Sequence, residues 1–315
     1  MRIKILDRKA MGYDTPIEIL EKFGEISVYD NTTPDELIER SIDADILIFN
    51  KVKITEEVIQ KSKSLKLLCV FATGYDNIDL DAAKANGVAV YNVPGYSTES
   101  VTLFTVATVT ALAAKLTEYR EYVNSGEYSE SDSANKLTPV YHEISGKTWG
   151  IIGYGNIGRS VAHIAEALGA RVLINRKTPR GNEKEVDIET LCKQSDIITV
   201  HCPLNNETRN LINEERISLM KDSVILVNEA RGAVFSEKDV ANAVKSGKIA
   251  ALGCDVYSSE PFRPEHPYYE IRNLPNVILT PHAAWGSYEA RERCVNTIAS
   301  NIKSYLNGEK KNRIV

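Results

Sequence analysis

Three polar residues with complementary chemistry follow three short apolar segments in the second half of the chain. Arg231 stands in Asn-Glu-Ala-Arg-Gly, Glu260 in Ser-Ser-Glu-Pro, and His282 in Thr-Pro-His-Ala. Each apolar segment has the length of a β-strand, and ligands of open parallel sheets bind beyond the carboxyl ends of the strands. We therefore expect the three side chains to meet in one crevice.

An arginine, a glutamate and a histidine together suit the reduction of a 2-keto acid by hydride. The planar guanidinium of Arg231 matches a carboxylate. Histidine changes charge nearest to neutral pH, so His282 can protonate the ketone oxygen while hydride reaches the carbon. Glu260 is expected to hold the other ring nitrogen of His282, which fixes the tautomer. Each residue alone is also typical of an ion pair, a loop or a packed side chain, so the interpretation depends on all three.

The source of hydride is indicated by Gly153, Gly155 and Gly158, spaced G-x-G-x-x-G. Gly153 permits a tight turn, Gly155 allows the backbone to approach a pyrophosphate, and Gly158 lets a helix pack closely. The apolar run 147–152 before them predicts a strand, and residues 157–168 after them show helical spacing. A helix that begins here directs its N–H groups at an anion, so the segment predicts a dinucleotide-binding turn.

The type of nicotinamide cofactor is indicated by the residue at the end of the next strand. Enzymes of this fold that use NAD usually carry an acid there, which binds the ribose hydroxyls. This chain has Asn175, followed by Arg176 and Lys177. A neutral residue beside two cations favours the 2′-phosphate of NADP(H), with NAD(H) as the alternative.

Two series of alternating strands and helices must position these residues. The expected strands are 3–6, 26–29, 46–49, 67–71 and 88–91 in the first series, and 147–152, 172–175, 197–200, 224–228, 250–255 and 277–280 in the second. The expected helices follow Thr15, Thr33, Thr55 and Asp79, span 97–122 without a break, and close the chain at 288–306, with an irregular surface segment at 124–141. The alternation predicts an α/β protein with two doubly wound parallel sheets.

Several motifs together resemble the D-isomer-specific 2-hydroxyacid dehydrogenase family over essentially the whole chain. They are the glycine turn, His201-Cys202-Pro203-Leu204 with Thr208, Ala230-Arg231-Gly232, Glu260-Pro261 and Pro281-His282. The stretch from Asn92 to Val101 looks most like the hydroxypyruvate and glyoxylate reductase branch, which is also called glycerate dehydrogenase. The resemblance implies a discontinuous, flavodoxin-like substrate-binding domain, 1–96 with 284–315, and a Rossmann dinucleotide-binding domain, 97–283.

The same resemblance implies further site residues. Thr73 and Gly74 match a segment that binds the substrate carboxylate through backbone N–H groups, and Trp285 is expected to wall the pocket beside His282. Glu229 departs from the small or hydroxyl residue expected at its position. The residues placed along the cofactor, besides the three glycines, are Asn156, Ile157, Cys202, Pro203, Thr208, Glu229, Ala230, Arg231 and Asp255.

The expected activity is reduction of hydroxypyruvate or glyoxylate to D-glycerate or glycolate. The alternatives within the family are a D-lactate dehydrogenase and a 3-phosphoglycerate dehydrogenase. An alternative of another class comes from the segment 281–285, which also resembles the C-terminal-binding corepressors that sense a dinucleotide and recruit partners. Turnover of small 2-keto acids separates the enzymes from the binding protein.

Composition limits the partners. The 315 residues carry a net charge of −5, which gives no reason to expect nucleic acid or an anionic membrane as a partner. Five scattered cysteines without a C-x-x-C pair predict reduced thiols and no metal site. The N-terminus lacks a signal-peptide pattern, so we expect a cytoplasmic protein. The segment 97–122 is more apolar than one core face requires and the family is commonly dimeric, so we expect a homodimer.

Overall fold

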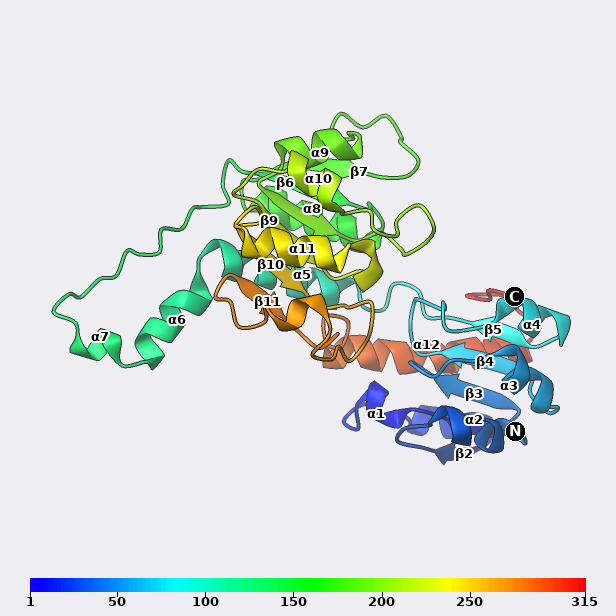
Figure 1. Ribbon diagram of the computed structural model, residues 1–315. Helices are drawn as coiled ribbons and strands as arrows, with labels where there is room; N and C mark the ends of the chain where they lie inside the picture. The colour runs from blue at the N-terminus through cyan, green and yellow to red at the C-terminus, as the bar shows by residue number, and fades with distance from the viewer. The chain divides into compact units, whose positions relative to one another are not determined.

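A computed structural model describes residues 1–315 and divides into two compact units (Figure 1). One unit combines Met1–Ser97 with Gly286–Val315, and the other is Thr98–Trp285. Each unit contains one sheet in which all paired strands run parallel, with helices around it. The predicted fold class, two doubly wound α/β units, is thereby confirmed.

The first unit is built on a five-stranded sheet. Its strands are β1 (Arg2–Ile5), β2 (Glu25–Val28), β3 (Ile46–Phe49), β4 (Leu67–Val70) and β5 (Ala89–Tyr91), in the order β2-β1-β3-β4-β5. Its helices are α1 (Arg8–Met11), the 3₁₀ helix η1 (Glu18–Phe23), α2 (Pro34–Ser41), α3 (Glu56–Lys61), α4 (Leu80–Ala85) and α12 (Tyr288–Leu306). The strand order reverses between β1 and β3, as in flavodoxin-like sheets.

Local sequence explains most of the helix boundaries in this unit. Thr33 and Glu36 form a capping box at the start of α2, where Pro34 occupies the first turn. The side chain of Asp79 accepts the N–H of Ala82 and begins α4. The helix expected after Thr15 is the 3₁₀ helix η1 instead, because the Thr15 hydroxyl donates to a carbonyl of the preceding turn and does not cap a helix.

The second unit is built on a six-stranded sheet. Its strands are β6 (Thr148–Ile152), β7 (Arg171–Asn175), β8 (Ile197–Val200), β9 (Ile225–Asn228), β10 (Ala251–Cys254) and β11 (Val277–Leu279), in the order β11-β10-β9-β8-β6-β7. Its helices are α5 (Thr98–Ala113), α6 (Leu116–Asn124), α7 (Glu127–Glu130), α8 (Asn156–Ala167), α9 (Ile188–Gln194), α10 (Glu214–Leu219), η2 (Gly232–Val234), α11 (Glu237–Lys245) and η3 (Pro267–Tyr269). The order reverses between β6 and β8, and ligands of open parallel sheets bind at the carboxyl ends of the strands at such a point.

Apolar side chains fill both faces of this second sheet. One cluster joins Val109 and Leu112 of α5 to Trp149 of β6 and Val161 of α8. Trp149 is fully buried, and its ring N–H donates to the hydroxyl of Thr199 at 3.1 Å. A cluster that includes residues of α9, α10 and α11 covers the other face. All five cysteines are free thiols in buried positions.

The prediction of one unbroken helix over 97–122 is wrong, because the segment forms two helices. Helix α5 ends at Ala113, and Lys115 adopts a left-handed conformation with φ 56°. The direction of α6 differs from that of α5 by 66°. Seven residues of α5 are buried, whereas α6 has none, because it has passed the edge of the sheet and has no surface to cover. The segment of α6, α7 and the chain that follows projects away from the rest of its unit (Figure 1).

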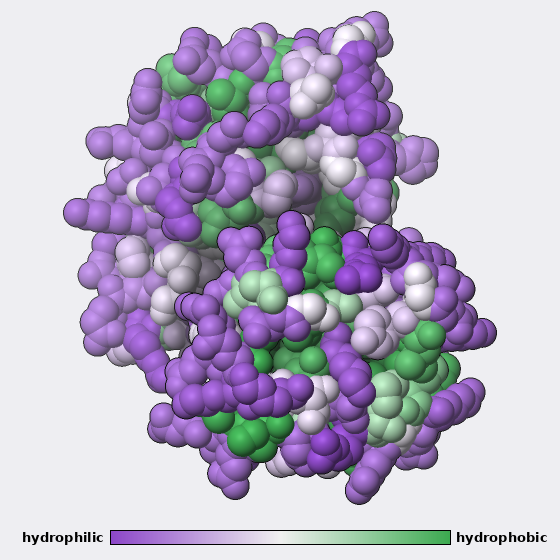
Figure 2. All heavy atoms as spheres, turned by 90° about the vertical axis from the view of Figure 1, so that its right-hand side faces the viewer, coloured by the Kyte–Doolittle hydropathy of each residue, from purple (hydrophilic) through white to green (hydrophobic).

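The surface drawn in Figure 2 is mainly hydrophilic, and its apolar residues form small separate patches. No single helix has the length and apolar composition of a membrane span. Taken together, the bent pair α5 and α6 passes that test by length and composition only.

Candidate active site

The glycine turn between β6 and α8 has the geometry of a phosphate-binding turn. Gly153 has φ 90°, and a Cβ there would lie 2.6 Å from the backbone N of Cys202. A Cβ on Gly158 would lie 2.1 Å from the carbonyl oxygen of Gly153. A Cβ on Gly155 would meet nothing within 4 Å, so this glycine leaves open space beside the N-terminus of α8. Tight packing at two glycines and open space at the third fit a pyrophosphate next to Asn156 and Ile157.

The end of β7 presents Asn175 with two cations after it. The side-chain N–H of Asn175 donates to the carbonyl of Val186 at 3.1 Å. Arg176 pairs with Glu185 at 3.3 Å and lies over the ring of Tyr154. Lys177 pairs with Glu207 at 2.6 Å, although both side chains are largely exposed. The positive groups expected for a 2′-phosphate are therefore present, each with an acidic neighbour.

The loop after β8 carries the next residues expected along the cofactor. Burial raises the pKa of the Cys202 thiol to about 11, so this side chain is a neutral, apolar group. The hydroxyl of Thr208 donates to the carbonyl of Pro203 at 2.7 Å, which closes the loop. His201 is half-buried, its Nε2 lies 3.0 Å from the hydroxyl oxygen of Thr199, and burial lowers its pKa to about 3. His201 is therefore neutral and is not a candidate for the acid.

Glu229, the unexpected residue after β9, is buried against α5. Its Oε2 lies 2.5 Å from the hydroxyl oxygen of Thr105, which also lies 2.8 Å from the carbonyl of Val101. A hydroxyl has one proton, so if that proton goes to the carbonyl, the proton between Thr105 and Glu229 belongs to the carboxyl. Burial, together with the nearby charge of Asp255, raises the pKa of Glu229 to about 8, although the hydrogen bond with Thr105 acts in the opposite direction. Glu229 is a neutral carboxylic acid at pH 7.

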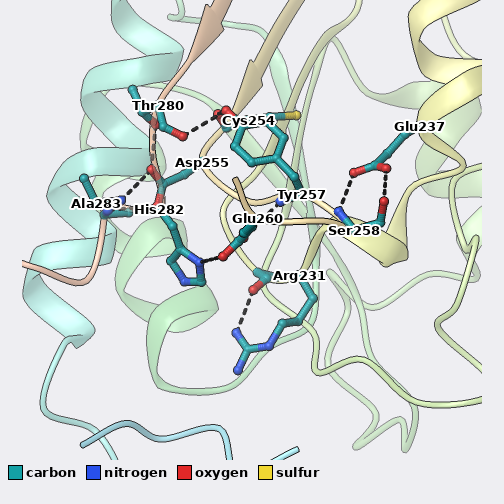
Figure 3. A network of polar contacts seen from close by, with 12 residues as sticks. Arg231, Glu237, Cys254, Asp255, Tyr257, Ser258, Glu260, Thr280, His282 and Ala283 are labelled. Atoms are coloured by element: carbon teal, nitrogen blue, oxygen red, sulfur yellow. Dashed lines mark hydrogen bonds and ion pairs between the residues drawn. The ribbon is translucent and has the colours of Figure 1, made fainter. Parts of the chain in front are cut away.

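Asp255 holds the turn that carries His282. One carboxylate oxygen accepts the hydroxyl of Thr280 at 2.6 Å and the N–H of Ala283 at 2.8 Å, and the other accepts the N–H of Ala284 at 2.9 Å (Figure 3). His282 itself has φ 54°, an uncommon conformation for a residue other than glycine. Three hydrogen bonds around His282 thus stabilise a backbone that a free chain rarely adopts.

His282 and Glu260 form a close pair beyond the ends of β11 and β10. His282 Nδ1 lies 2.6 Å from Glu260 Oε2, and the other oxygen of Glu260 accepts the N–H of Tyr257 at 3.1 Å (Figure 3). A carboxylate can only accept, so Nδ1 carries a proton and Nε2 is the ring atom left for proton exchange. Both side chains are partly accessible, at 22% and 28%, so a substrate can reach them.

Arg231 follows β9 and is half-buried. Its Nη1 donates to the carbonyl of Ala230 at 2.8 Å, and its guanidinium lies on the same side of the sheet edge as the His282 and Glu260 pair (Figure 3). Asn228 fixes the same turn, because its side chain binds the N–H of Ala230 and the carbonyl of Arg231. The three residues predicted from the sequence to meet in one crevice therefore lie together in the second unit.

Two other predicted substrate contacts, Thr73 and Gly74, belong to the first unit. The hydroxyl of Thr73 donates to the carbonyl of Val93 at 2.8 Å, and the side chain of Asn92 donates to the carbonyl of Thr73. No hydrogen bond in the structure uses the backbone N–H of Thr73 or Gly74. Trp285, the last residue of the second unit, is partly exposed.

Sequence reasoning missed a second buried pair, Glu237 with His266. Glu237 begins α11 and His266 precedes η3, and both side chains are less than a tenth exposed. An acid in the first turn of a helix and a histidine before proline are ordinary signals, so nothing local marks them. Along the chain, Glu237 lies 29 residues from His266 and 21 residues from Ser258.

A parallel sheet with a phosphate-binding turn, together with an arginine and a glutamate-bound histidine at its carboxyl edge, defines a dinucleotide-dependent oxidoreductase. The comparisons with known proteins make the class specific. The sequence profile described as "D-isomer specific 2-hydroxyacid dehydrogenase, NAD binding domain" matches residues 106–284. The chain belongs to the D-isomer-specific 2-hydroxyacid dehydrogenase family, and it is an NAD(P)-dependent enzyme acting on CH–OH donors.

Relatives cover nearly the whole chain. It is 36% identical to a hydroxypyruvate reductase of Blautia hydrogenotrophica, covering 98% of each chain, and 36% identical to a glycerate dehydrogenase of Methylorubrum extorquens, covering 99% of this chain and 98% of the relative. It is 35% identical to a glyoxylate reductase of Thermococcus litoralis, covering 93% and 91%.

Two solved structures show which cofactors occur in similar proteins. An acyclic imino acid reductase in complex with NADPH and D-Arg is 33% identical, with a TM-score of 0.86 over the full length of both chains. A D-lactate dehydrogenase of Aquifex aeolicus complexed with NAD and lactic acid is 30% identical, with a TM-score of 0.87 over 100% of this chain and 99% of that one. A nicotinamide dinucleotide is thus the cofactor of this protein too.

Proposed function

We propose that this protein reduces hydroxypyruvate or glyoxylate to D-glycerate or glycolate. The observation that carries the proposal is the His282 and Glu260 pair, 2.6 Å apart, on the same edge of the sheet as Arg231 and the phosphate-binding turn. The choice of substrate within the family is supported by the names of three relatives, which are hydroxypyruvate reductase, glycerate dehydrogenase and glyoxylate reductase.

Each residue of the site has a separate task in this reaction. The bound nicotinamide cofactor supplies the hydride that reduces the keto carbon. His282 gives the proton on Nε2 to the ketone oxygen, so that the product leaves as a neutral alcohol. Glu260 holds Nδ1 and stabilises the charged ring before the transfer. Arg231 binds the substrate carboxylate through its guanidinium and orients the ketone toward His282.

The substrate contacts of the first unit are part of the same proposal. The backbone N–H groups of Thr73 and Gly74, which make no hydrogen bond in the structure, suit a carboxylate oxygen. Trp285 is proposed as an apolar wall that keeps water from the ketone, because it follows His282 by three residues and is partly exposed.

We favour NADP(H) over NAD(H) as the cofactor. Asn175 brings no negative charge to the end of β7, and Arg176 and Lys177 supply two cations beside it. Glu185 is the acid nearest to Arg176, but its Oε2 already accepts the backbone N–H groups of 180, 181 and 182. This acid is engaged within its own loop, so it opposes a 2′-phosphate less than an acid at position 175 would.

We expect the protein to be a homodimer formed through the segment that projects from the second unit. That segment exposes large apolar side chains at positions that its own unit does not cover, namely Leu116, Val123, Tyr128, Leu137, Val140 and Tyr141. Burial of such side chains against a second copy removes them from water. Sedimentation at micromolar concentration should give twice the mass of 35.0 kDa, and a monomer would contradict this expectation.

The test of the function is a matrix of initial rates. NADPH and NADH are each followed by absorbance with hydroxypyruvate, glyoxylate, pyruvate and 3-phosphohydroxypyruvate as separate substrates. Fastest oxidation of NADPH with hydroxypyruvate or glyoxylate is the expected result. Preference for pyruvate or for the phosphorylated acid would contradict the proposed substrate. Preference for NADH would contradict only the proposed cofactor, and no turnover with any acid would contradict the proposed function.

A further inference from the structure

A buried carboxylate, that of Glu237, lies behind the loop that carries Glu260. Its Oε1 accepts the backbone N–H of Ser258 at 2.8 Å (Figure 3). Its Oε2 accepts the hydroxyl of Ser258 and the ring N–H of His266, whose Nε2 lies 2.9 Å away. Only 8% of the Glu237 side chain is exposed, so these three donors and the N-terminus of α11 replace water around the charge.

His266 orients Glu237 and is itself fixed. Its Nδ1 accepts the backbone N–H of Tyr268 at 3.1 Å, so the ring proton lies on Nε2 and points at Glu237. The rings of Tyr257 and Phe262 pack around it, with centroids 5.9 Å and 5.1 Å away. Neither member of the pair can turn without losing a buried hydrogen bond.

Glu237 holds the peptide between Tyr257 and Ser258, and the Tyr257–Ser258 segment contacts the active site from two sides. The N–H of Tyr257 donates to Glu260, the partner of His282. A Cβ on Gly232 would lie 2.3 Å from the backbone N of Ser258, so the residue next to Arg231 packs directly on the same peptide. The position of the Tyr257–Ser258 segment therefore affects both the N–H that holds Glu260 and the turn of Arg231.

We propose that Glu237, oriented by His266, is a positioning residue for the reaction: it fixes the Tyr257–Ser258 segment, whose Tyr257 N–H holds Glu260 against Nδ1 of His282. The proposal rests on the function proposed above for the His282 and Glu260 pair. Glu237 touches neither of these two side chains directly, so its effect must pass through the peptide and Glu260. A displacement of about 1 Å in such a support can cost on the order of a hundredfold in rate.

The test is a double-mutant cycle between Glu237→Gln and Glu260→Gln in the full-length protein. A glutamine at 237 places an amide N–H against at least one of the donors that the carboxylate now accepts, and so displaces the peptide. Glu270→Gln is the matched control, because Glu270 is exposed and pairs only with Lys245. The measured quantities are kcat, KM, the pH profile of kcat/KM with hydroxypyruvate and NADPH, and the cofactor Kd.

If Glu237 acts through Glu260, Glu237→Gln lowers kcat about tenfold to a hundredfold in the wild-type background and less than about threefold in the Glu260→Gln background. The midpoint of its pH profile moves in the same direction as that of Glu260→Gln, while the cofactor Kd and the control variant stay unchanged. His266→Gln, which can offer a donor and an acceptor, retains more activity than His266→Phe.

The proposal would be overturned if Glu237→Gln lowered kcat by the same factor in both backgrounds, so that the two effects multiply. It would also be overturned if Glu237→Gln retained full activity. If Glu237→Gln fails to fold, Ser258→Ala, which removes only the hydroxyl contact, is taken through the same cycle and must show the same loss of effect in the Glu260→Gln background. Failure of the underlying function is distinguishable, because then the wild-type protein and Glu260→Gln turn over the keto acid equally slowly.

Discussion

Replacing Glu229 with glutamine should make the second unit more stable at alkaline pH. The carboxyl is buried against Thr105, and its pKa rises from the ordinary 4.5 to about 8. The folded state therefore holds a proton that the unfolded chain has already lost above pH 4.5. Between these two values the free energy of unfolding falls as pH rises, and above pH 8 the cost is constant.

The size of the effect follows from the same shift. Each pH unit inside this window costs about 1.4 kcal/mol, so the window from pH 4.5 to 8 corresponds to about 5 kcal/mol in total. From pH 6 to pH 9 the wild type should lose about 3 kcal/mol relative to Glu229→Gln. Glutamine keeps the shape and can donate to Thr105, so the two proteins should differ little in packing.

Urea unfolding followed by tryptophan fluorescence measures this difference. Both tryptophans, Trp149 and Trp285, belong to the second unit, so the signal reports on the unit that holds Glu229. Glu143→Gln, an exposed position of the same unit, is the control and should show no such dependence. A stability difference between the wild type and Glu229→Gln that is the same at pH 6 and pH 9 would refute the reasoning.

Three further predictions concern the site. Arg231→Lys should lower kcat/KM for the keto acid about tenfold to a hundredfold, because the guanidinium fork is lost, while the cofactor Kd measured by fluorescence stays within about twofold; an unchanged kcat/KM would exclude the role in carboxylate binding. Gly155→Ala should weaken cofactor binding about tenfold or more without loss of thermal stability. Gly158→Ala should instead cost about 2 kcal/mol of unfolding free energy, because its Cβ meets the carbonyl of Gly153. Equal behaviour of the two variants would contradict the geometry of the turn. Asn175→Asp should raise the KM for NADPH about tenfold and leave that for NADH unchanged or lower, and a uniform change in both KM values would argue against a 2′-phosphate at this position.

The sequence predicted the regular elements well where their patterns are strong. β8 at 197–200 and α12 at 288–306 have the predicted bounds, because an apolar run of strand length and a long amphipathic period each leave few alternatives. The break between α5 and α6 was not predictable from the pattern, because apolar residues continue across it and Lys115 adopts its left-handed conformation without a glycine. Only the edge of the sheet, a tertiary feature, ends α5.

The residues of the candidate site also divide into those that the sequence predicts and those that it does not. Arg231, Glu260 and His282 were predictable because each follows a strand of a parallel sheet, and such ends share one edge. The neutral state of Glu229 was not, since it depends on Thr105, which lies 124 residues earlier in the chain. The hydrogen bonds of Glu237 likewise join residues that are 21 and 29 positions apart and become neighbours only in the folded unit.

The most direct test of the central claim is the rate of NADPH oxidation with hydroxypyruvate by the wild type and by His282→Gln, measured together with the cofactor Kd. We expect rapid oxidation by the wild type, a rate lower by about 10²- to 10⁴-fold in the variant, and equal affinity of both proteins for the cofactor. A variant as fast as the wild type, or one that loses cofactor binding to the same extent as activity, would contradict the assignment of His282 as the proton donor.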